Sequence, residues 1–324
     1  MVIALIAVMI APASAGSQTA AARDIGVRLL DVPVAMRNDP RAQLYIVDHL
    51  APGTIIHRRI EISNSTKAPV RIALYPAAAA IARGTFLGAA GHTPNDLSTW
   101  TSILPNTLDV PARGHMIATV TISVPSDAAP GEQYSVVWAE ARSTPSHDRG
   151  VVQVSRVGIR LYLSVGAGGP PAANFAIDSL TAMRSQDGEP MVLASVHNTG
   201  GRALDMNGTL ELSNGPGGLS AGPFPATLGV TLAIGETETV TITLNNQIPA
   251  GPWDSRITLR SGLLERTARA TLTFPAAGAT APVITIPTRP GWLYPVGTIL
   301  LVLLLGITTL IMLRRQVGHA PASS

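Results

Sequence analysis

Apolar and polar side chains alternate along many short segments of this chain. The clearest is His115–Val124, where the apolar positions include Met116, Ala118, Val120, Ile122 and Val124. A period of two is typical of a β-strand with one buried face. This pattern, or a run of β-branched residues, predicts further strands at Ile55–Ser63, Val70–Tyr75, Tyr134–Ala141, Val151–Val165, Thr239–Leu244 and Arg256–Arg260. In the last two we expect Val240, Ile242, Leu244, Ile257 and Leu259 to face inward.

Helical periodicity is scarce between the two ends of the chain. No window of ten or more residues up to Gly166 has a helical stripe, although Ala77–Ala82 predicts a short turn of helix. The run Gly-Ala-Gly-Gly-Pro-Pro-Ala-Ala at Gly166–Ala173 indicates an interdomain linker at 167–174, because adjacent prolines limit regular structure and glycines add freedom.

The two halves on either side of this linker repeat one order of elements. Each has a strand that ends in asparagine (Asn64 and Asn198), a strand alternating with threonine, a Pro/Gly turn and another strand. We therefore expect an all-β fold of two tandem immunoglobulin-like β-sandwiches, at 25–166 and 175–275. The alternative is a chance similarity of strand and turn composition, in which case both halves are still all-β.

The segment 292–313 is apolar throughout and carries no charge. As a helix it spans roughly 33 Å, which predicts one C-terminal transmembrane helix. Trp292 and Tyr294 fit one membrane interface, and Arg314 and Arg315 fit the cytoplasmic one. Residues 276–291 then form a stalk and 314–324 a cytoplasmic tail, with both sandwiches extracellular. The alternative is a buried core helix.

The N-terminus predicts export. Met1–Ile10 is almost wholly apolar, and Ala13-Ser14-Ala15 fits a signal-peptide cleavage site, which gives a signal peptide at 1–15 and a linker at 16–24. No lysine or arginine precedes the apolar run, so an uncleaved anchor is the alternative.

The amino-acid composition excludes several classes of partner and of chemical site. Charged residues are 13% of the chain and the net charge is +3, with two positive charges beside the predicted span, so no nucleic-acid partner is expected. The absence of cysteine excludes disulfides, zinc–thiolate sites and thiol catalysis. Lys67 is the only lysine, and this preference for arginine favours a high-GC Gram-positive bacterium and its plasma membrane.

A search for catalytic motifs finds none, and we predict no catalytic, metal or cofactor residues. Gly-x-Ser-x-Gly, His-Glu-x-x-His and the phosphate-binding loop are absent, and the histidines are scattered singly. Asn95 and Asp96, with Asp109 downstream, suggest either a calcium loop or ordinary turn residues, and the spacing favours turns.

Three tryptophans lie outside the predicted span. Trp138 is expected in the core and Trp253 at one end of a sandwich. Trp100 lies in a polar segment and is either an exposed ligand contact or buried cover. Together with Asn95 and Asp96 it is the candidate ligand contact.

The first half contains a set of short motifs: Tyr45-Ile-Val-Asp48, Pro52-Gly53, Ile60-Glu-Ile-Ser-Asn64-Ser65, Val70–Pro76, Gly84-Thr85-Phe86, Asn95-Asp-Leu-Ser98 and Ala129-Pro-Gly131. In these motifs the chain resembles the WxL-interacting proteins of bacterial surfaces. The resemblance implies peptidoglycan binding by the first domain and partner binding by the second. Ser135-Val-Val-Trp138 departs from the family's Gly-Gly-Ile-like run, and the second domain matches in fold pattern only.

These observations favour a non-enzymatic, membrane-anchored surface protein that binds cell wall peptidoglycan and exported surface proteins. A structural spacer without wall affinity is the second hypothesis. A hydrolase with a site assembled from dispersed Asp and His residues is the third.

Overall fold

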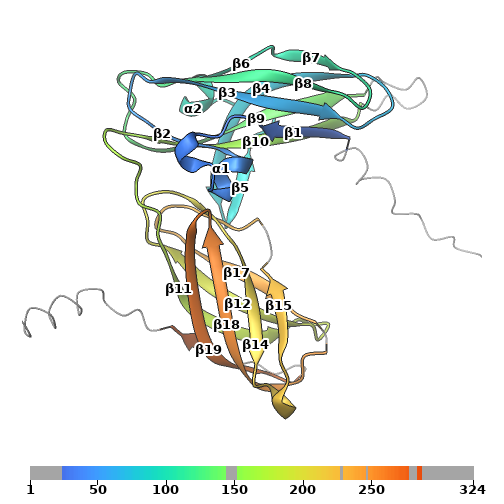
Figure 1. Ribbon diagram of the computed structural model, residues 1–324, viewed down its shortest axis with the longest axis vertical. Helices are drawn as coiled ribbons and strands as arrows, with labels where there is room; N and C mark the ends of the chain where they lie inside the picture. The colour runs from blue at the N-terminus through green and yellow to red at the C-terminus, as the bar shows by residue number, and fades with distance from the viewer. Residues whose placement is uncertain (1–23, 144–151, 227–228, 246, 277–282, 287–324) are drawn as a thin grey trace, which may run out of the picture. The chain divides into compact units, whose positions relative to one another are not determined.

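The computed structural model describes residues 24–143, 152–226, 229–245, 247–276 and 283–286, and β-strands dominate them (Figure 1). The described chain up to Ile284 belongs to one compact unit. The predicted signal peptide (1–15), the span at 292–313 and the flanking residues Trp292, Tyr294, Arg314 and Arg315 lie outside the described residues. Within the described ranges, no helix has the length and apolarity needed to cross a bilayer.

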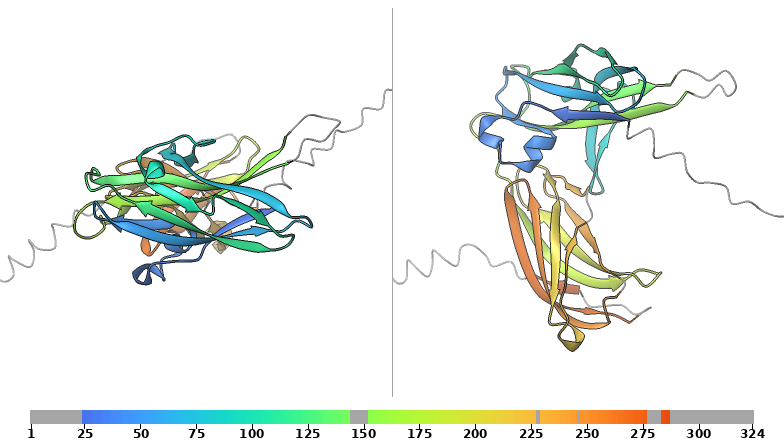
Figure 2. Two further views of the ribbon diagram at one scale, coloured as in Figure 1. Left: turned by 90° about the horizontal axis from the view of Figure 1, so that it is seen from above. Right: turned by 45° about the vertical axis from the view of Figure 1, so that its right-hand side comes forward.

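The first sandwich consists of two sheets with a core between them (Figure 2). One sheet has the order β1 (Ile25–Leu29), β3 (Ile55–Asn64), β8 (His115–Ser123) and β6 (Thr101–Leu104). The other has the order β2 (Ile46–Leu50), β10 (Val154–Val165), β9 (Gly131–Arg142), β4 (Val70–Ala82) and β5 (Thr85–Gly88), and β7 (Thr107–Val110) also pairs with β4. β2 joins β10 in parallel.

The second sandwich repeats the arrangement. One sheet has the order β17 (Thr237–Thr243), β12 (Pro190–Asn198), β11 (Phe175–Arg184) and β20 (Val283–Thr285). The other has the order β15 (Ala221–Pro225), β14 (Asn207–Ser213), β18 (Gly251–Ser261) and β19 (Leu264–Phe274). A two-stranded ribbon joins β13 (Leu204–Asp205) to β16 (Thr231–Leu232). Four short helical turns complete the described chain: η2 (Val34–Met36), α1 (Pro40–Leu44), α2 (Asp96–Thr99) and η3 (Pro216–Gly218).

Both sandwiches follow an immunoglobulin-like order, and the predicted strands are confirmed where the structure describes them; Val151, at the start of one of them, lies outside the described residues. β1-β3-β8 corresponds to β11-β12-β17, and β10-β9-β4 corresponds to β19-β18-β14. In β8 the even-numbered positions Ala118, Val120 and Ile122 are buried, whereas Ile117 is exposed. Alternation thus places one face of each strand between the sheets. The residues predicted to face inward in the second half are buried as well: Val240, Ile242, Leu244, Ile257 and Leu259.

Asn64 closes one corner of the first sandwich. Its side chain is 1% exposed, and Nδ2 donates to the carbonyls of Ala68 at 2.8 Å, Val110 at 3.2 Å and Pro111 at 3.0 Å. Its Oδ1 accepts from the backbone N–H of Thr66 at 2.9 Å. One side chain therefore ties the end of β3 to its own turn and to the end of β7.

Asn198 makes the same set of bonds in the second sandwich. It is also 1% exposed, and Nδ2 donates to the carbonyls of Arg202 at 2.9 Å, Leu232 at 3.3 Å and Ala233 at 3.0 Å. Its Oδ1 accepts from the N–H of Gly200 at 3.0 Å. The sequence repeat thus reflects a shared structural device.

One sequence prediction differs from the structure. Ala77–Ala82 is not a helical turn, because β4 continues through it and pairs with β9 and β5, so the sheet hydrogen bonds override the helix propensity of alanine. The predicted linker makes hydrogen bonds to the second sandwich: the carbonyls of Ala172 and Asn174 accept from Gly201 and Thr199 at 2.9 and 3.1 Å. Within the predicted stalk, Val283–Thr285 forms the edge strand β20.

Candidate functional site

The sheet containing β9 and β10 is covered on both faces. Its inner face contributes to the core, and its outer face carries an aromatic layer with arginines above it. Four of the chain's five tyrosines lie in this layer, which consists of Tyr45, Tyr75, Phe86, Tyr134, Trp138 and Tyr162. Ala203 of the second sandwich is buried in the same cluster. We call this surface the aromatic face.

Two glycines make room for the largest ring of the aromatic face. A Cβ atom at Gly88 or Gly158 would lie 2.7 Å from a Trp138 ring carbon, which is too close for any side chain. The Trp138 Nε1 donates to the carbonyl of Ala89 at 2.9 Å. The ring of Trp138 therefore lies against the outer face of the sheet. It is partly buried there and packs on an apolar cluster outside the sheet, separate from the core between the two sheets.

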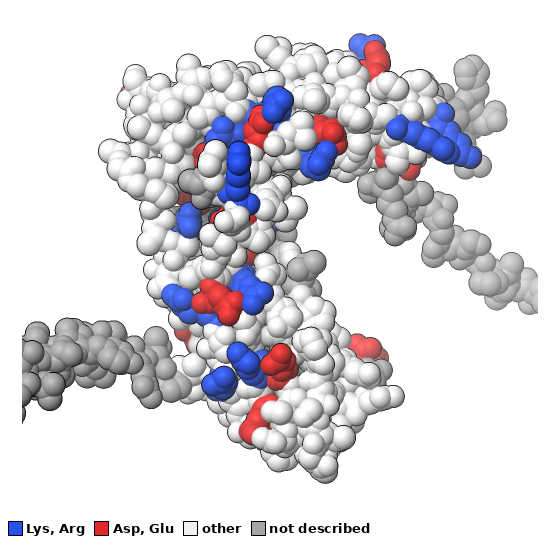
Figure 3. Space-filling model, in the orientation of Figure 1, with Lys and Arg blue, Asp and Glu red and all other residues white. Residues whose placement is uncertain are grey.

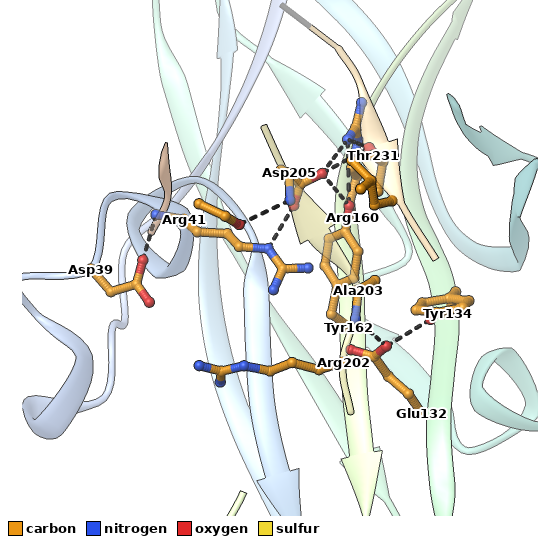
Figure 4. Close-up of polar contacts among 12 residues, drawn as sticks. Asp39, Arg41, Glu132, Tyr134, Arg160, Tyr162, Arg202, Ala203, Asp205 and Thr231 are labelled. Atoms are coloured by element: carbon orange, nitrogen blue, oxygen red, sulfur yellow. Dashed lines mark hydrogen bonds and ion pairs between the residues drawn. The ribbon is translucent and has the colours of Figure 1, made fainter. Parts of the chain in front are cut away.

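Asp205 of the second sandwich is bound by residues of this face (Figure 4). Arg41 Nε donates to Oδ2 at 2.5 Å. Oδ1 accepts from Tyr162 Oη at 2.8 Å, Arg160 Nη1 at 3.1 Å and Thr231 Oγ1 at 2.9 Å. Three of these four donors belong to the first sandwich, so one carboxylate fastens the two halves. We call Asp205 and its four donors the junction cluster.

The cations of the junction cluster lie against rings. The Arg41 Cζ is 4.0 Å from the centroid of Tyr162, and the Arg160 Cζ is 4.9 Å from that of Phe86. Arg41 is only 7% exposed, and burial acts against its charge, but Asp205, Tyr162 and Glu132 together outweigh burial and raise the Arg41 pKa above its usual range. Burial, reinforced by Asp205, also raises the pKa of Tyr162. Arg41 therefore keeps its charge, and Tyr162 stays a neutral phenol, at physiological pH.

A second link between the halves uses Glu132 at the start of β9. Its Oε2 accepts from Tyr134 Oη and from the backbone N–H of Ala203, both at 2.6 Å. Burial raises the pKa of Glu132, and the hydrogen bonds from Tyr134 and Ala203 oppose that shift. The turn of the β4–β5 hairpin adds a third link, in which Thr231 N donates to the carbonyl of Gly84 at 2.7 Å.

A cavity of about 310 Å³ lies beside the junction cluster. Residues from both sandwiches line it, among them Val47, Asp48, His49, Glu132, Tyr162 and Arg202. Within the described chain, three of these side chains keep a buried polar atom without a hydrogen-bond partner: Asp48 Oδ2, His49 Nε2 and Arg202 Nε. We call it the junction cavity.

The outer sheet of the second sandwich, β15-β14-β18-β19, has a different surface. It carries a shallow groove of about 750 Å³ lined by Glu211, Asp254, Arg256 and Arg269, among others. The Arg256–Glu211 contact is 3.9 Å long and both side chains are more than half exposed. Acidic and basic side chains lie next to one another over this sandwich on the face seen in Figure 3. We call this surface the charged groove.

The residues predicted as ligand contacts have structural partners. Asn95 caps α2: its Oδ1 accepts from Ser98 N at 3.0 Å, and its Nδ2 donates to the carbonyl of Tyr134 at 2.7 Å. Trp100 packs against the first core, which corresponds to the buried-cover alternative. Asp96 is exposed in the first turn of α2. No group of three His, Asp or Glu residues in the described ranges could hold a metal ion.

Sequence reasoning did not identify the junction residues. Arg41 and Asp205 are 164 positions apart, so no local pattern joins them. Two signals were present: the Asp39-Pro40 pair that begins α1, and the alternation of Arg160, Tyr162 and Ser164 with buried leucines in β10. A strand with arginine and tyrosine on its second face indicates a second buried interface. Trp253, expected at an end of a sandwich, is 1% exposed in β18.

The sequence matches no family model and no curated protein. Similar solved structures include the YadV chaperone, at 11% identity over 76% of this chain and 100% of that one, with a TM-score of 0.41. The Pseudomonas aeruginosa CupB2 chaperone has 12% identity over 70% and 97% of the two chains and a TM-score of 0.38. A structure of the Salmonella enterica SafA pilin in complex with the SafB chaperone has 11% identity over 76% and 96%, with a TM-score of 0.40.

Proposed function

We propose that this chain is a non-enzymatic protein of the bacterial surface that binds cell wall peptidoglycan and exported proteins. In this proposal residues 292–313 anchor it in the plasma membrane by a single span. The two sandwiches are extracellular, and the segment after Arg314 and Arg315 is cytoplasmic. The apolar C-terminal segment and the motifs shared with the WxL-interacting proteins support this assignment.

The observation that carries the proposal is the junction cluster. A partly buried carboxylate with four donors holds the two sandwiches together. Two domains joined by a flexible linker would move independently, whereas this pair presents its surfaces as one body. Since the aromatic face is occupied by the second sandwich, the charged groove is the partner surface that we propose, and the loops and edges of the first sandwich are left for the wall.

Wall affinity is tested by co-sedimentation of the full-length chain, purified in detergent, with isolated peptidoglycan. We expect the chain in the pellet at low and at physiological salt. A chain that stays in the supernatant at low salt contradicts wall binding.

Partner binding is tested by photo-crosslinking in intact membranes. A crosslinker at Arg269, in the charged groove, should trap an exported protein. The same group at Arg71, 76% exposed on the first sandwich, is the matched control and should not trap that protein. Equal labelling from both positions contradicts a specific groove.

A spacer without wall affinity is the second candidate, and the junction cluster favours it too, because a rigid pair sets a fixed length. The same experiments separate the two functions. A spacer gives crosslinks to one membrane complex and none to wall material.

A further inference from the structure

The junction cavity combines charged groups with an apolar lining. Asp39, Asp48 and Glu132 bring negative charge and Arg202 brings positive charge to the same 310 Å³ space, and Val47 and Tyr162 supply apolar wall. Pockets for small ligands share this composition, with a few polar groups in an apolar lining, and a volume near the lower end of about 300–1,000 Å³.

In two of the polar side chains of this cavity, one polar atom has a hydrogen-bond partner and the other has none among the described residues. Asp48 Oδ1 accepts from Arg58 at 2.7 Å, which leaves the buried Oδ2 without a donor among the described residues. His49 Nδ1 lies 3.1 Å from Ser164 Oγ. The other ring nitrogen, Nε2, is buried and has no hydrogen-bond partner among the described residues. Buried polar groups without partners destabilise a fold by about 1–3 kcal/mol each, so a site that keeps several of them is suited to a ligand that completes their bonds.

Arg202 supplies the cationic side of the cavity. Its Nε is buried without an acceptor in the described chain, and the carboxylates of Asp39 and Glu132 line the same cavity. Burial, and then repulsion from Arg41, lower the Arg202 pKa. A partly buried guanidinium with a repelling neighbour and a buried free donor favours an incoming anion, and a carboxylate matches its geometry.

We propose that the junction cavity binds a compact zwitterion of amino-acid or dipeptide size, with its carboxylate on Arg202 and its ammonium on Asp48. His49 Nε2 adds a hydrogen bond to the ligand, and Val47 and Tyr162 contact its aliphatic part. Because the cavity is lined from both sandwiches, such a ligand bridges them and stabilises the junction. This site is separate from the wall and groove contacts and does not depend on them.

The ligand side of the proposal is tested on the unaltered full-length chain in detergent. Alanyl-alanine is titrated by calorimetry beside its carboxamide and its N-acetyl derivative, which each lack one charge. We expect binding of the zwitterion and a loss of about tenfold or more for each derivative. No binding of the dipeptide at millimolar concentration overturns the proposal, and equal binding of all three compounds overturns the charge assignment. The L,L and D,D forms distinguish a product of protein breakdown from one of wall turnover.

The protein side uses Arg202→Gln and Asp48→Asn, with Arg71→Gln as the exposed control. Arg202→Gln should weaken the dipeptide by about tenfold and leave its carboxamide unchanged. Asp48→Asn should weaken the dipeptide and leave the N-acetyl form unchanged. A merely structural role would reduce all ligands alike, which contradicts the proposal. Wall binding that persists without dipeptide binding refutes only this inference, and dipeptide binding without wall affinity refutes only the proposed function.

Discussion

The two sandwiches share one frame and differ in what their outer sheets carry. Asn64 and Asn198 make the same bonds to their own turn and to the neighbouring strand end. Outside the β9–β10 sheet of the first sandwich lie six aromatic rings and the buried Arg41, whereas outside β14 and β18 lie exposed charges.

The comparison shows that the outer faces of the sheets, and not the inner faces, make contacts that require particular residues. The inner faces contain interchangeable apolar residues, which are enough for an immunoglobulin-like frame. The outer face of the first sandwich instead binds one specific carboxylate, that of Asp205. It also needs glycine at positions 88 and 158, because a side chain at Gly88 or Gly158 would collide with the ring of Trp138. The two sandwiches therefore differ most on their outer faces, and we expect variants at these faces to affect the two sandwiches differently.

The largest effect is expected at the junction. Asp205→Ala leaves Arg41 buried without its counter-ion, and we expect about 3–5 kcal/mol less unfolding free energy. Chemical denaturation of the full-length chain measures this. Glu211→Ala, on the exposed outer sheet, is the control and should change stability by less than about 0.5 kcal/mol. Similar losses of unfolding free energy for the two variants would contradict the claim that the two outer faces differ in their contribution to stability.

The shared frame is tested next. Asn64→Ala and Asn198→Ala each remove one buried amide and leave several backbone groups unpaired, at about 1–3 kcal/mol for each group. Because the two bond sets match, we expect losses of similar size, seen as faster amide hydrogen exchange in the sandwich that carries the change. If only one of the two variants loses stability, the two asparagines do not contribute equally to the stability of their sandwiches.

The close approach of Trp138 gives a smaller effect. Gly158→Ala places a Cβ 2.7 Å from the Trp138 ring, and overpacking of this kind typically costs about 1–3 kcal/mol. Gly169→Ala, where no described atom lies within 4 Å of the added carbon, should be neutral. The melting temperatures of both variants provide the measurement, and an unchanged value for Gly158→Ala would refute the packing argument.

The smallest effect concerns pH. Burial raises the pKa of Glu132 above its ordinary 4.5, so the folded state holds this proton more tightly, and stability falls as pH rises from 4.5 through the raised value. Hydrogen bonds from Asn214 and Thr271 lower the pKa of Asp254 below 3.8, so its contribution is present above 3.8 and is lost as pH falls through the lowered value. Unfolding measured against pH for Glu132→Gln and Asp254→Asn should show opposite slopes relative to the parent, and slopes of the same sign would contradict this.

Much of the frame is predictable because its signals are local. The alternation in β8 and the strands that end at Asn64 and Asn198 lie within ten residues of sequence and each specify one face or one turn. The helical reading of Ala77–Ala82 failed because its strand pairing with β5 and β9 is not local. Propensity is decided by tertiary contacts there.

The site is less predictable for the same reason. The sequence leaves Asn95 and Trp100 between a ligand contact and a structural role. In the structure Asn95 caps α2 and Trp100 packs against the first core. Asp205 is one of many separate acidic residues, and only the fold brings it to Arg41, Arg160 and Tyr162. The one hint in the sequence was that aromatic residues are scarce and that four of the five tyrosines lie in the first half, which indicates an aromatic surface there.

The most direct test of the account is a double-mutant cycle between Arg41 and Asp205 in the full-length chain. Unfolding free energies of Arg41→Met, Asp205→Ala and the double variant are compared with the parent. We expect a coupling free energy of at least about 1.5 kcal/mol, so that the second change costs little once the first is made. Losses that add to within about 0.5 kcal/mol would contradict the claim that this pair fastens the two sandwiches.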